Sequence, residues 1–74
     1  MLEKTKRSIE TEILRLLEKQ GELTVAFLTR FLNEMGIECT RQKVEKVLRK
    51  LVEKGLVEVF YTNGNRRRHY RLVV

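Results

Sequence analysis

The side chains most able to do chemistry in this sequence are cations, and they are concentrated in one part of the chain. Between Arg41 and Lys54, Lys and Arg recur every few residues, and the acidic interruptions are Glu45 and Glu53 alone. A second basic run, 66–68, consists of three consecutive arginines. Clustered cations of this kind suit a polyanion, because each can neutralise a phosphate and release its counterion.

The charge balance differs between the two halves of the chain. The 74 residues carry a formal net charge of +6. Residues 1–39 hold six Lys and Arg against seven Glu, whereas residues 40–74 hold ten against three. A basic region confined in this way is typical of a nucleic-acid-binding surface. The alternative, an ordinary solvated surface, would more often spread its positive charge along the whole chain.

The residues needed for catalysis or metal binding are nearly absent. The sequence has no aspartate, one histidine (His69) and one cysteine (Cys39), too few for a protein-built zinc site or an intrachain disulfide. No glycine-rich phosphate loop occurs, and the glutamates are expected on helix exteriors in intrahelical pairs. We therefore expect no enzyme activity, no cofactor and no metal.

The composition also indicates a compartment and a domain count. No stretch approaches the roughly 20 apolar residues that cross a bilayer, and the N-terminus runs directly into a charged amphipathic segment unlike a signal peptide. The lone cysteine is typical of a reducing compartment. These features predict a cytoplasmic protein. One domain over residues 1–74 is expected, since neither half alone would bury a core.

Three amphipathic helices are expected, because apolar residues recur at helical spacing before Gly21, Gly36 and Gly55. Thr5 or Ser8 is the expected N-cap of the first helix. The predicted buried residues are Ile9, Ile13, Leu16 and Leu17 in the first helix, Leu28, Phe31, Leu32 and Met35 in the second, and Val44, Val47, Leu48, Leu51 and Val52 in the third. Residues 22–24 read as a short extended piece, with Thr24 and Thr40 as N-caps of the second and third helices.

After Gly55 the apolar period changes from about 3.6 to about 2 residues, which predicts a hairpin of residues 56–61 and 68–73. Asn63-Gly64 is a strong signal for a two-residue type I′ turn. The register that follows pairs Thr62 with Asn65, Tyr61 with Arg66, Phe60 with Arg67, Glu58 with His69, and Val57 with Tyr70. Val57 and Tyr70 then face the helices, and the charged Glu58–His69 pair faces outward.

Several single residues have a more ordinary interpretation than a ligand-binding one. Tyr70 is expected in the core, and Phe60 is a better candidate for exposure than Tyr61. We interpret His69 as half of a plain cross-strand pair. Cys39 is expected to be a small filler residue, with a redox role as the lesser alternative.

The order helix, short strand, helix, helix and two-stranded wing resembles the winged-helix DNA-binding family. The resemblance covers roughly residues 5–74. It is most specific over residues 44–57, where the third helix ends in the pattern Leu-x-x-Lys-Gly-Leu-Val. It implies an α+β winged helix-turn-helix fold with three helices, a short first strand and a C-terminal two-stranded β wing. The sequence looks most like the compact stand-alone winged-helix proteins of archaea and their viruses.

The resemblance implies that double-stranded DNA is the partner and that the third helix and the wing contact it. With the apolar stripe turned inward, the outer side of the third helix holds Gln42, a candidate reader of an adenine edge, and cations for guanine edges or phosphates. The wing arginines suit a narrow minor groove. The predicted DNA-binding residues are Thr40, Arg41, Gln42, Lys43, Lys46, Arg49, Lys50, Asn63, Asn65, Arg66, Arg67 and Arg68.

Each part of this prediction has an alternative explanation that does not involve DNA. The basic helix face can be an ordinary solvated face, and the arginine run can guard an edge strand against aggregation. Strand alternation would also send Arg67 to one side of the wing and Arg66 and Arg68 to the other. Cations in the first turn of the third helix nevertheless favour a phosphate partner, because the helix dipole there disfavours positive charge.

A transcriptional regulator without a visible small-molecule effector is the leading functional hypothesis. The alternatives are a winged-helix protein-interaction module and a nonspecific architectural DNA binder. Leu2, Leu14, Val73 and Val74 have no clear place in a minimal core and together suggest a self-association patch. A homodimer would place two third helices on half-sites about one turn of DNA apart.

Overall fold

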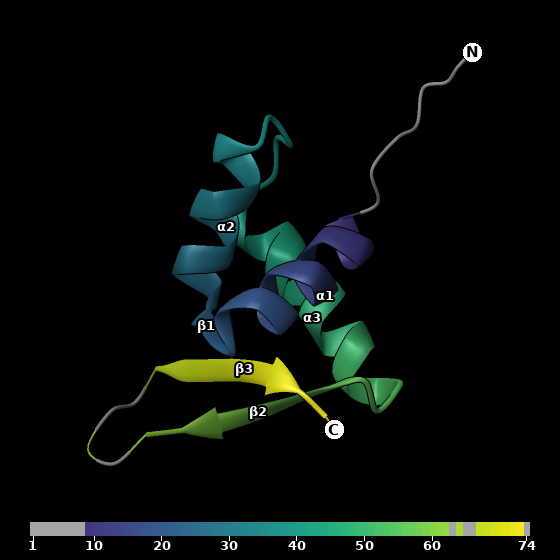
Figure 1. The fold of residues 1–74 in the computed structure, drawn as a ribbon, viewed down its shortest axis with the longest axis vertical. Helices are drawn as coiled ribbons and strands as arrows, with labels where there is room; N and C mark the ends of the chain where they lie inside the picture. Colours follow the sequence, from purple (N-terminus) through teal and green to yellow (C-terminus); the bar gives the residue numbers. More distant parts are fainter. Residues whose placement is uncertain (1–8, 63, 65–66, 74) are drawn as a thin grey trace.

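Three helices lie on one side of a small antiparallel sheet, as Figure 1 shows for the computed structural model. The structure describes residues 9–62, 64 and 67–73. The elements, in chain order, are α1 (Ile9–Gln20), β1 (Glu22–Thr24), α2 (Val25–Glu34), α3 (Arg41–Glu53), β2 (Val57–Tyr61) and β3 (Arg68–Leu72). This is the α+β winged helix-turn-helix arrangement that the sequence predicts, with β2 and β3 as the wing.

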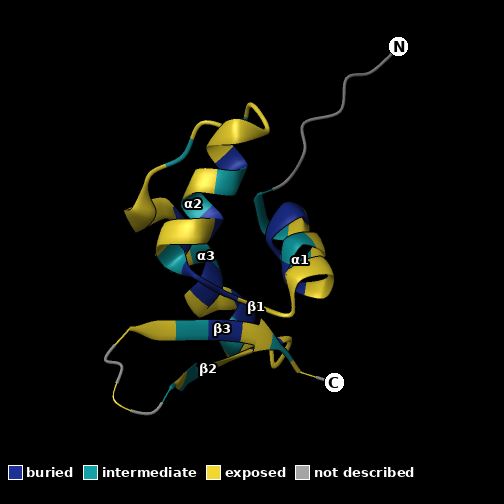
Figure 2. Ribbon diagram, turned by 60° about the vertical axis from the view of Figure 1, so that its left-hand side comes forward, coloured by how far each residue is buried: buried dark blue, intermediate teal, exposed yellow. Residues whose placement is uncertain are grey.

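The core lies where the three helices meet the sheet (Figure 2). Its apolar side chains come from every element because each predicted stripe faces inward. The buried residues are Ile13, Leu17, Leu23, Leu28, Leu32, Val44, Leu48, Leu51, Val57 and Tyr70. Phe31 is half-buried, and Met35 is exposed, so the second predicted stripe is wider than the true core. Within the described residues, no helix has the length and apolar character needed to cross a membrane.

Threonines begin two of the helices, as predicted. The Thr24 hydroxyl accepts a hydrogen bond from the backbone N–H of Phe27 at 3.4 Å, and the Thr40 hydroxyl accepts one from Lys43 at 3.2 Å. Such bonds satisfy backbone donors that have no partner inside the helix. The predicted caps of α1, Thr5 and Ser8, lie outside the described residues.

Gly55 lies in the turn between the end of α3 and the start of β2. Its φ of 78° is a left-handed conformation that favours glycine. Around it, the Gly55 N–H donates to the Val52 carbonyl and the Leu56 N–H donates to the Leu51 carbonyl, both at 3.0 Å. This helix-ending motif turns the chain so that Val57 enters β2 beneath the core.

The short first strand completes a three-stranded sheet of order β1-β3-β2. β3 is therefore the central strand, antiparallel to both neighbours. Leu23 of β1 lies opposite Tyr70, and Tyr70 lies opposite Val59 on the other side. The edge strand β1 thus connects the base of the wing directly to the start of α2, because Thr24 is both the last residue of β1 and the N-cap of α2.

The predicted wing register is wrong by two residues. The structure pairs Val57 with Leu72, Glu58 with Arg71, Val59 with Tyr70, Phe60 with His69 and Tyr61 with Arg68. The predicted pairs Thr62–Asn65 and Tyr61–Arg66 fall on Asn65 and Arg66, which lie outside the described residues, as does Asn63. The observed register places Tyr70 and Leu72 opposite Val59 and Val57, so apolar pairing outweighs the two-residue turn. A shift of two preserves which face each residue occupies.

The outer face of the sheet also differs from the prediction. Glu58 pairs with Arg71 at 2.6 Å rather than with His69, and His69 Nδ1 lies 3.5 Å from Glu22 of β1. Phe60 is half-buried because the Arg71 guanidinium lies 4.2 Å from its ring centroid. Tyr61 is 58% exposed, so the expected order of exposure for these two aromatic residues is reversed. Tyr70 lies in the core, as expected.

Candidate nucleic-acid interface

The connection between α2 and α3 fixes where the basic helix begins. The Asn33 side-chain amide donates to the Cys39 carbonyl at 3.2 Å and to the Thr29 carbonyl at 2.8 Å. These bonds tie the last turn of α2 to the residue that precedes the Thr40 cap. Thr40 therefore enters α3 from a restrained loop, and the first cation of the helix, Arg41, has a defined position.

The residues predicted on the outside of α3 are exposed, but they do not form one patch. Lys43 and Lys50 lie on the flank facing α1, beside Ile9 and Glu10. Arg41 and Arg49 lie on the other flank, facing α2 and the wing. The two flanks arise because successive residues are rotated by about 100° around the helix axis, so residues two positions apart point in nearly opposite directions.

Gln42 and Lys46 occupy the exposed ridge between the two flanks. They are four residues, or about one helical turn, apart, so their side chains point in similar directions. Arg49 adjoins them on the wing side. This ridge is the part of α3 that can enter a groove of DNA with least obstruction from neighbouring elements.

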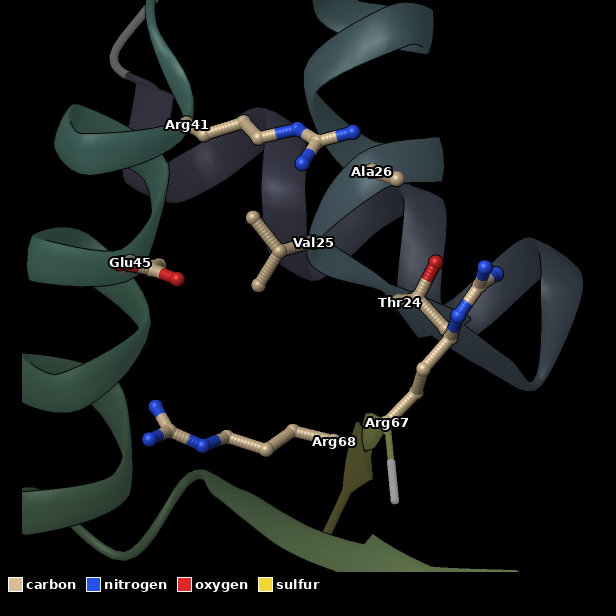
Figure 3. Close-up of a pocket in the computed structure, with 7 residues that line it drawn as sticks. All are labelled: Thr24, Val25, Ala26, Arg41, Glu45, Arg67 and Arg68. Carbon is tan, nitrogen blue, oxygen red and sulfur yellow. The ribbon is translucent and has the colours of Figure 1, made fainter. Parts of the chain in front are cut away.

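A cleft of about 350 Å³ opens between the starts of α2 and α3 and the wing. Figure 3 shows Arg41 extending from α3 toward Ala26 in the first turn of α2, and Arg68 extending from the wing toward α3. Arg67 projects near Thr24, the cap of α2. Three guanidinium groups from two distant parts of the sequence thus surround one opening.

Arg67 and Arg68 line the same cleft although strand alternation predicts opposite faces. The reason is that β3 begins at Arg68, so Arg67 lies in the connecting loop, where alternation does not apply. Arg68 lies opposite Tyr61 on the helix-facing side of the wing. The longer connection therefore brings together two arginines that a tight turn would separate.

The Tyr70 and Tyr61 hydroxyl groups influence the pKa of the Arg68 guanidinium. Hydrogen bonds that it donates to Tyr70 and Tyr61 raise its pKa above the usual arginine value. A second, smaller hollow of about 240 Å³ adjoins it, bordered by Arg49 of α3 and by these two tyrosines. Arg68 thus retains its charge and lies where the wing borders α3.

Two cations of the C-terminal half are neutralised within the fold. Lys54 pairs with Glu10 of α1 at 3.4 Å, and Arg71 pairs with Glu58 on the outer sheet face at 2.6 Å. Neither is among the predicted DNA-binding residues. Among the described residues, Arg41, Lys43, Lys46, Arg49 and Lys50 have no carboxylate within ion-pair range. Their charge is available to an external anion.

The match to a protein family decides the class of this molecule. The family model described as penicillinase repressor matches residues 8–74. The chain belongs to the penicillinase repressor family. This family is one of transcriptional repressors and not of enzymes, so the match confirms both the predicted winged-helix DNA-binding class and the expectation of a non-enzymatic protein.

Solved structures place this penicillinase repressor family member among winged-helix regulators. Bacillus subtilis PadR in complex with operator DNA is 26% identical, with a TM-score of 0.77 over 90% of this chain and 41% of that one. H. salinarum RosR is 25% identical, with a TM-score of 0.74 over 92% and 61%. The Vibrio cholerae ferric uptake regulator, at 19% identity, shares the fold with a TM-score of 0.79 over 95% of this chain and 54% of that one. No curated protein matches the sequence closely enough to add a relative.

This repressor-family chain spans about half the length of those solved chains. The similarity therefore covers the winged-helix region of the longer regulators. In the part of the chain that the structure describes, no group of three His, Cys, Asp or Glu side chains lies close enough to hold a metal ion.

Sequence reasoning missed one component of the site in this family member. The first turn of α2, with Thr24, Val25 and Ala26, forms a wall of the arginine-lined cleft. The available signal was the absence of acidic residues from that turn, since Asp and Glu are normally favourable there. The predicted wing residues Asn63, Asn65 and Arg66 lie outside the described residues.

Proposed function

We propose that this chain acts as a single DNA-binding domain of a cytoplasmic repressor, with α3 in the major groove and the wing on the adjacent backbone. One observation carries the proposal. Arg41, Arg67 and Arg68 surround a single cleft beside the exposed ridge of α3. Side chains that come from separate elements and converge on one opening are suited to one strand of a polyanion.

The position of the cleft supports separate roles for the predicted residues, some contacting phosphates and others contacting bases. A DNA phosphate on the α2 side of the cleft would meet the Arg41 and Arg67 guanidinium groups and the backbone N–H groups at the start of α2, where the helix dipole favours an anion. Glu45 lines the opposite, α3 side of the cleft. Gln42 and Lys46 on the ridge, with Arg49 beside them on the wing side, would then face base edges. Gln42 is suited to adenine and Arg49 to guanine. Backbone contacts set the position, and ridge contacts set the sequence preference.

The salt dependence of binding tests the phosphate contacts. If about seven phosphates are neutralised, log K should fall against log salt with a slope of about −6. A fluorescently labelled duplex titrated at several NaCl concentrations gives this slope. Removing Arg67 should reduce its magnitude by about one and weaken binding to every duplex alike. A slope near zero, or no shift of labelled duplex, would contradict the proposal.

The two flanks of α3 provide a matched comparison within the predicted set. Arg41→Ala and Lys43→Ala each remove one exposed cation from the first turn of the same helix. Arg41 lines the cleft, whereas Lys43 faces α1. We expect the larger loss of affinity from Arg41→Ala. An equal loss would mean that only the overall charge matters, which favours a nonspecific architectural binder.

A homodimer is part of the proposal, and an apolar hollow supports it. Leu14 of α1, Leu56, Leu72 and Val73 line a hollow of about 410 Å³. Leu56 and Val73 are 44% and 49% exposed, whereas the apolar residues of the core are buried. Leu14 and Val73 belong to the predicted self-association patch, whereas Leu2 and Val74 lie outside the described residues. A two-fold dimer would bind half-sites about one turn apart.

Sedimentation velocity over a range of protein concentrations tests the dimer. Val73→Asp should shift the chain toward the monomer, because it places a charge in the apolar hollow. Phe27→Asp is the matched control, since Phe27 is also 49% exposed but lies on α2, away from the hollow. If both variants sediment like the unmodified chain, the hollow is not the dimer contact.

A further inference from the structure

Glu45 places a carboxylate in the middle of the cationic surface. It lines the large cleft together with Arg41 and Arg68, and it lines the adjoining hollow together with Arg49. Figure 3 shows its side chain projecting from α3 into the large cleft. Its neighbours in the cleft include no other acidic side chain among the described residues.

The Glu45 carboxylate has no hydrogen-bond or ion-pair partner among the described residues. It lies four residues after Arg41 and four before Arg49, a spacing that commonly forms ion pairs along a helix. In Figure 3, however, Arg41 extends away from it toward Ala26 of α2. By contrast, Glu10, Glu34 and Glu58 pair with cations.

An unpaired carboxylate on a DNA-binding face needs a donor once DNA excludes water, because burying it without one is costly. Phosphates offer none and repel it. In the major groove the donors are the N4 amino group of cytosine and the N6 amino group of adenine. Adenine also presents the acceptor N7 beside its amino group, which repels a carboxylate, whereas cytosine presents an apolar edge there. Cytosine is therefore the base that suits Glu45.

We propose that Glu45 is a specificity-determining residue that accepts a hydrogen bond from the N4 amino group of a cytosine in the bound duplex. This inference rests on the proposed function, since it requires α3 in the major groove. Glu45 also repels phosphates, so it lowers the affinity for unselected DNA while leaving the affinity for the preferred duplex high. The contact adds to the readout by Gln42, which lies one turn earlier in α3.

The test is selection of bound sequences from a random duplex pool with the unmodified chain, Glu45→Ala and Glu45→Gln. The unmodified chain should select cytosine at one position of each half-site. Glu45→Ala should lose that preference by about fivefold or more while gaining affinity for unselected duplex. Glu45→Gln, which retains the shape of the side chain, should shift the same position toward adenine, the base that glutamine reads.

Glu53→Gln is the matched control, because it removes the same charge from α3 at an exposed residue that does not line the cleft. It should leave the cytosine position unchanged. If Glu45→Ala and Glu45→Gln select the same sequence as the unmodified chain, the Glu45 inference is overturned and the proposed function stands. If the unmodified chain selects no sequence, both are overturned. Thermal unfolding of each variant verifies that the comparison is between folded proteins.

Discussion

Asn33 and Cys39 are joined by a hydrogen bond that crosses the loop between α2 and α3. The Asn33 amide donates to the Cys39 carbonyl at 3.2 Å while it also donates to Thr29 at 2.8 Å. One exposed side chain therefore holds both ends of a connection that is longer than the tight turn of many helix-turn-helix proteins. The position of Arg41 depends on this contact, although Asn33 itself does not line the arginine-lined cleft.

Replacing Asn33 with alanine should loosen that loop. We expect the free energy of unfolding to fall by about 0.5 to 1 kcal/mol. In a domain of this size, Tm falls by roughly 4 to 8 °C for each 1 kcal/mol lost. DNA affinity should fall as well. Glu34→Ala is the control, since it removes only an exposed ion pair with Arg30. Equal urea midpoints for the two variants would contradict the role of Asn33.

Thr40 should matter to α3 through its hydroxyl group. Thr40→Ala should cost about 1 kcal/mol of unfolding free energy, because the Lys43 N–H loses its acceptor. Thr40→Ser keeps an acceptor at the same place and should restore most of the stability. Urea unfolding monitored by circular dichroism measures both. A serine variant as unstable as the alanine variant would show that the methyl group, and not the cap, is responsible.

The Glu58–Arg71 pair should contribute modestly and in a salt-dependent way. Both side chains are about half exposed, so solvent screens the pair, and Glu58→Gln should cost no more than about 0.5 to 1 kcal/mol. The difference in Tm between this variant and the unmodified chain should shrink in 1 M NaCl, where charges are screened within a few ångströms. A difference that persists at high salt would indicate that packing of Arg71 on Phe60 is the main contribution.

Cys39 should behave as a poorly reactive thiol. Burial raises its pKa above the usual thiol value, so the thiolate is scarcer in the folded chain than in the unfolded one. The linked stability is fully present below the pKa of the unfolded chain and is lost as the pH rises through the higher folded value. Alkylation by iodoacetamide near pH 8 should therefore be slower in buffer than in urea. Equal rates would support the alternative of a reactive cysteine.

The sequence predicts the helices and the class of fold well, for physical reasons that are local. Apolar residues at helical spacing and the threonine caps act within a few neighbouring residues, so α2 and α3 begin where Thr24 and Thr40 indicate. The pairing of Leu23 with Tyr70 joins segments that are distant in sequence, and no local sequence pattern predicts this pairing. The wing register failed for the same reason, since packing of Leu72 beneath the helices outweighed the preference of Asn63-Gly64 for a tight turn.

The candidate site was predicted as a set of residue types rather than as a shape. Charge density identified Arg41 and Arg67 without indicating that they line one cleft. The helical period separated inner from outer residues of α3, yet it does not reveal that α1 lies beside the face that holds Lys43. The position of each neighbouring element decides which exposed cations act together, and that position is a property of the folded chain.

The central place of β3 in the sheet sets the order in which this domain can assemble during translation. Residues 68–72 join β1 to β2, but in the part of the chain that the structure describes they follow all three helices. A nascent polypeptide that has emerged only through α3 lacks the strand that supports the wing. The domain therefore cannot reach its native sheet until those residues leave the ribosome, and until then the edges of β1 and β2 are open to association with other chains.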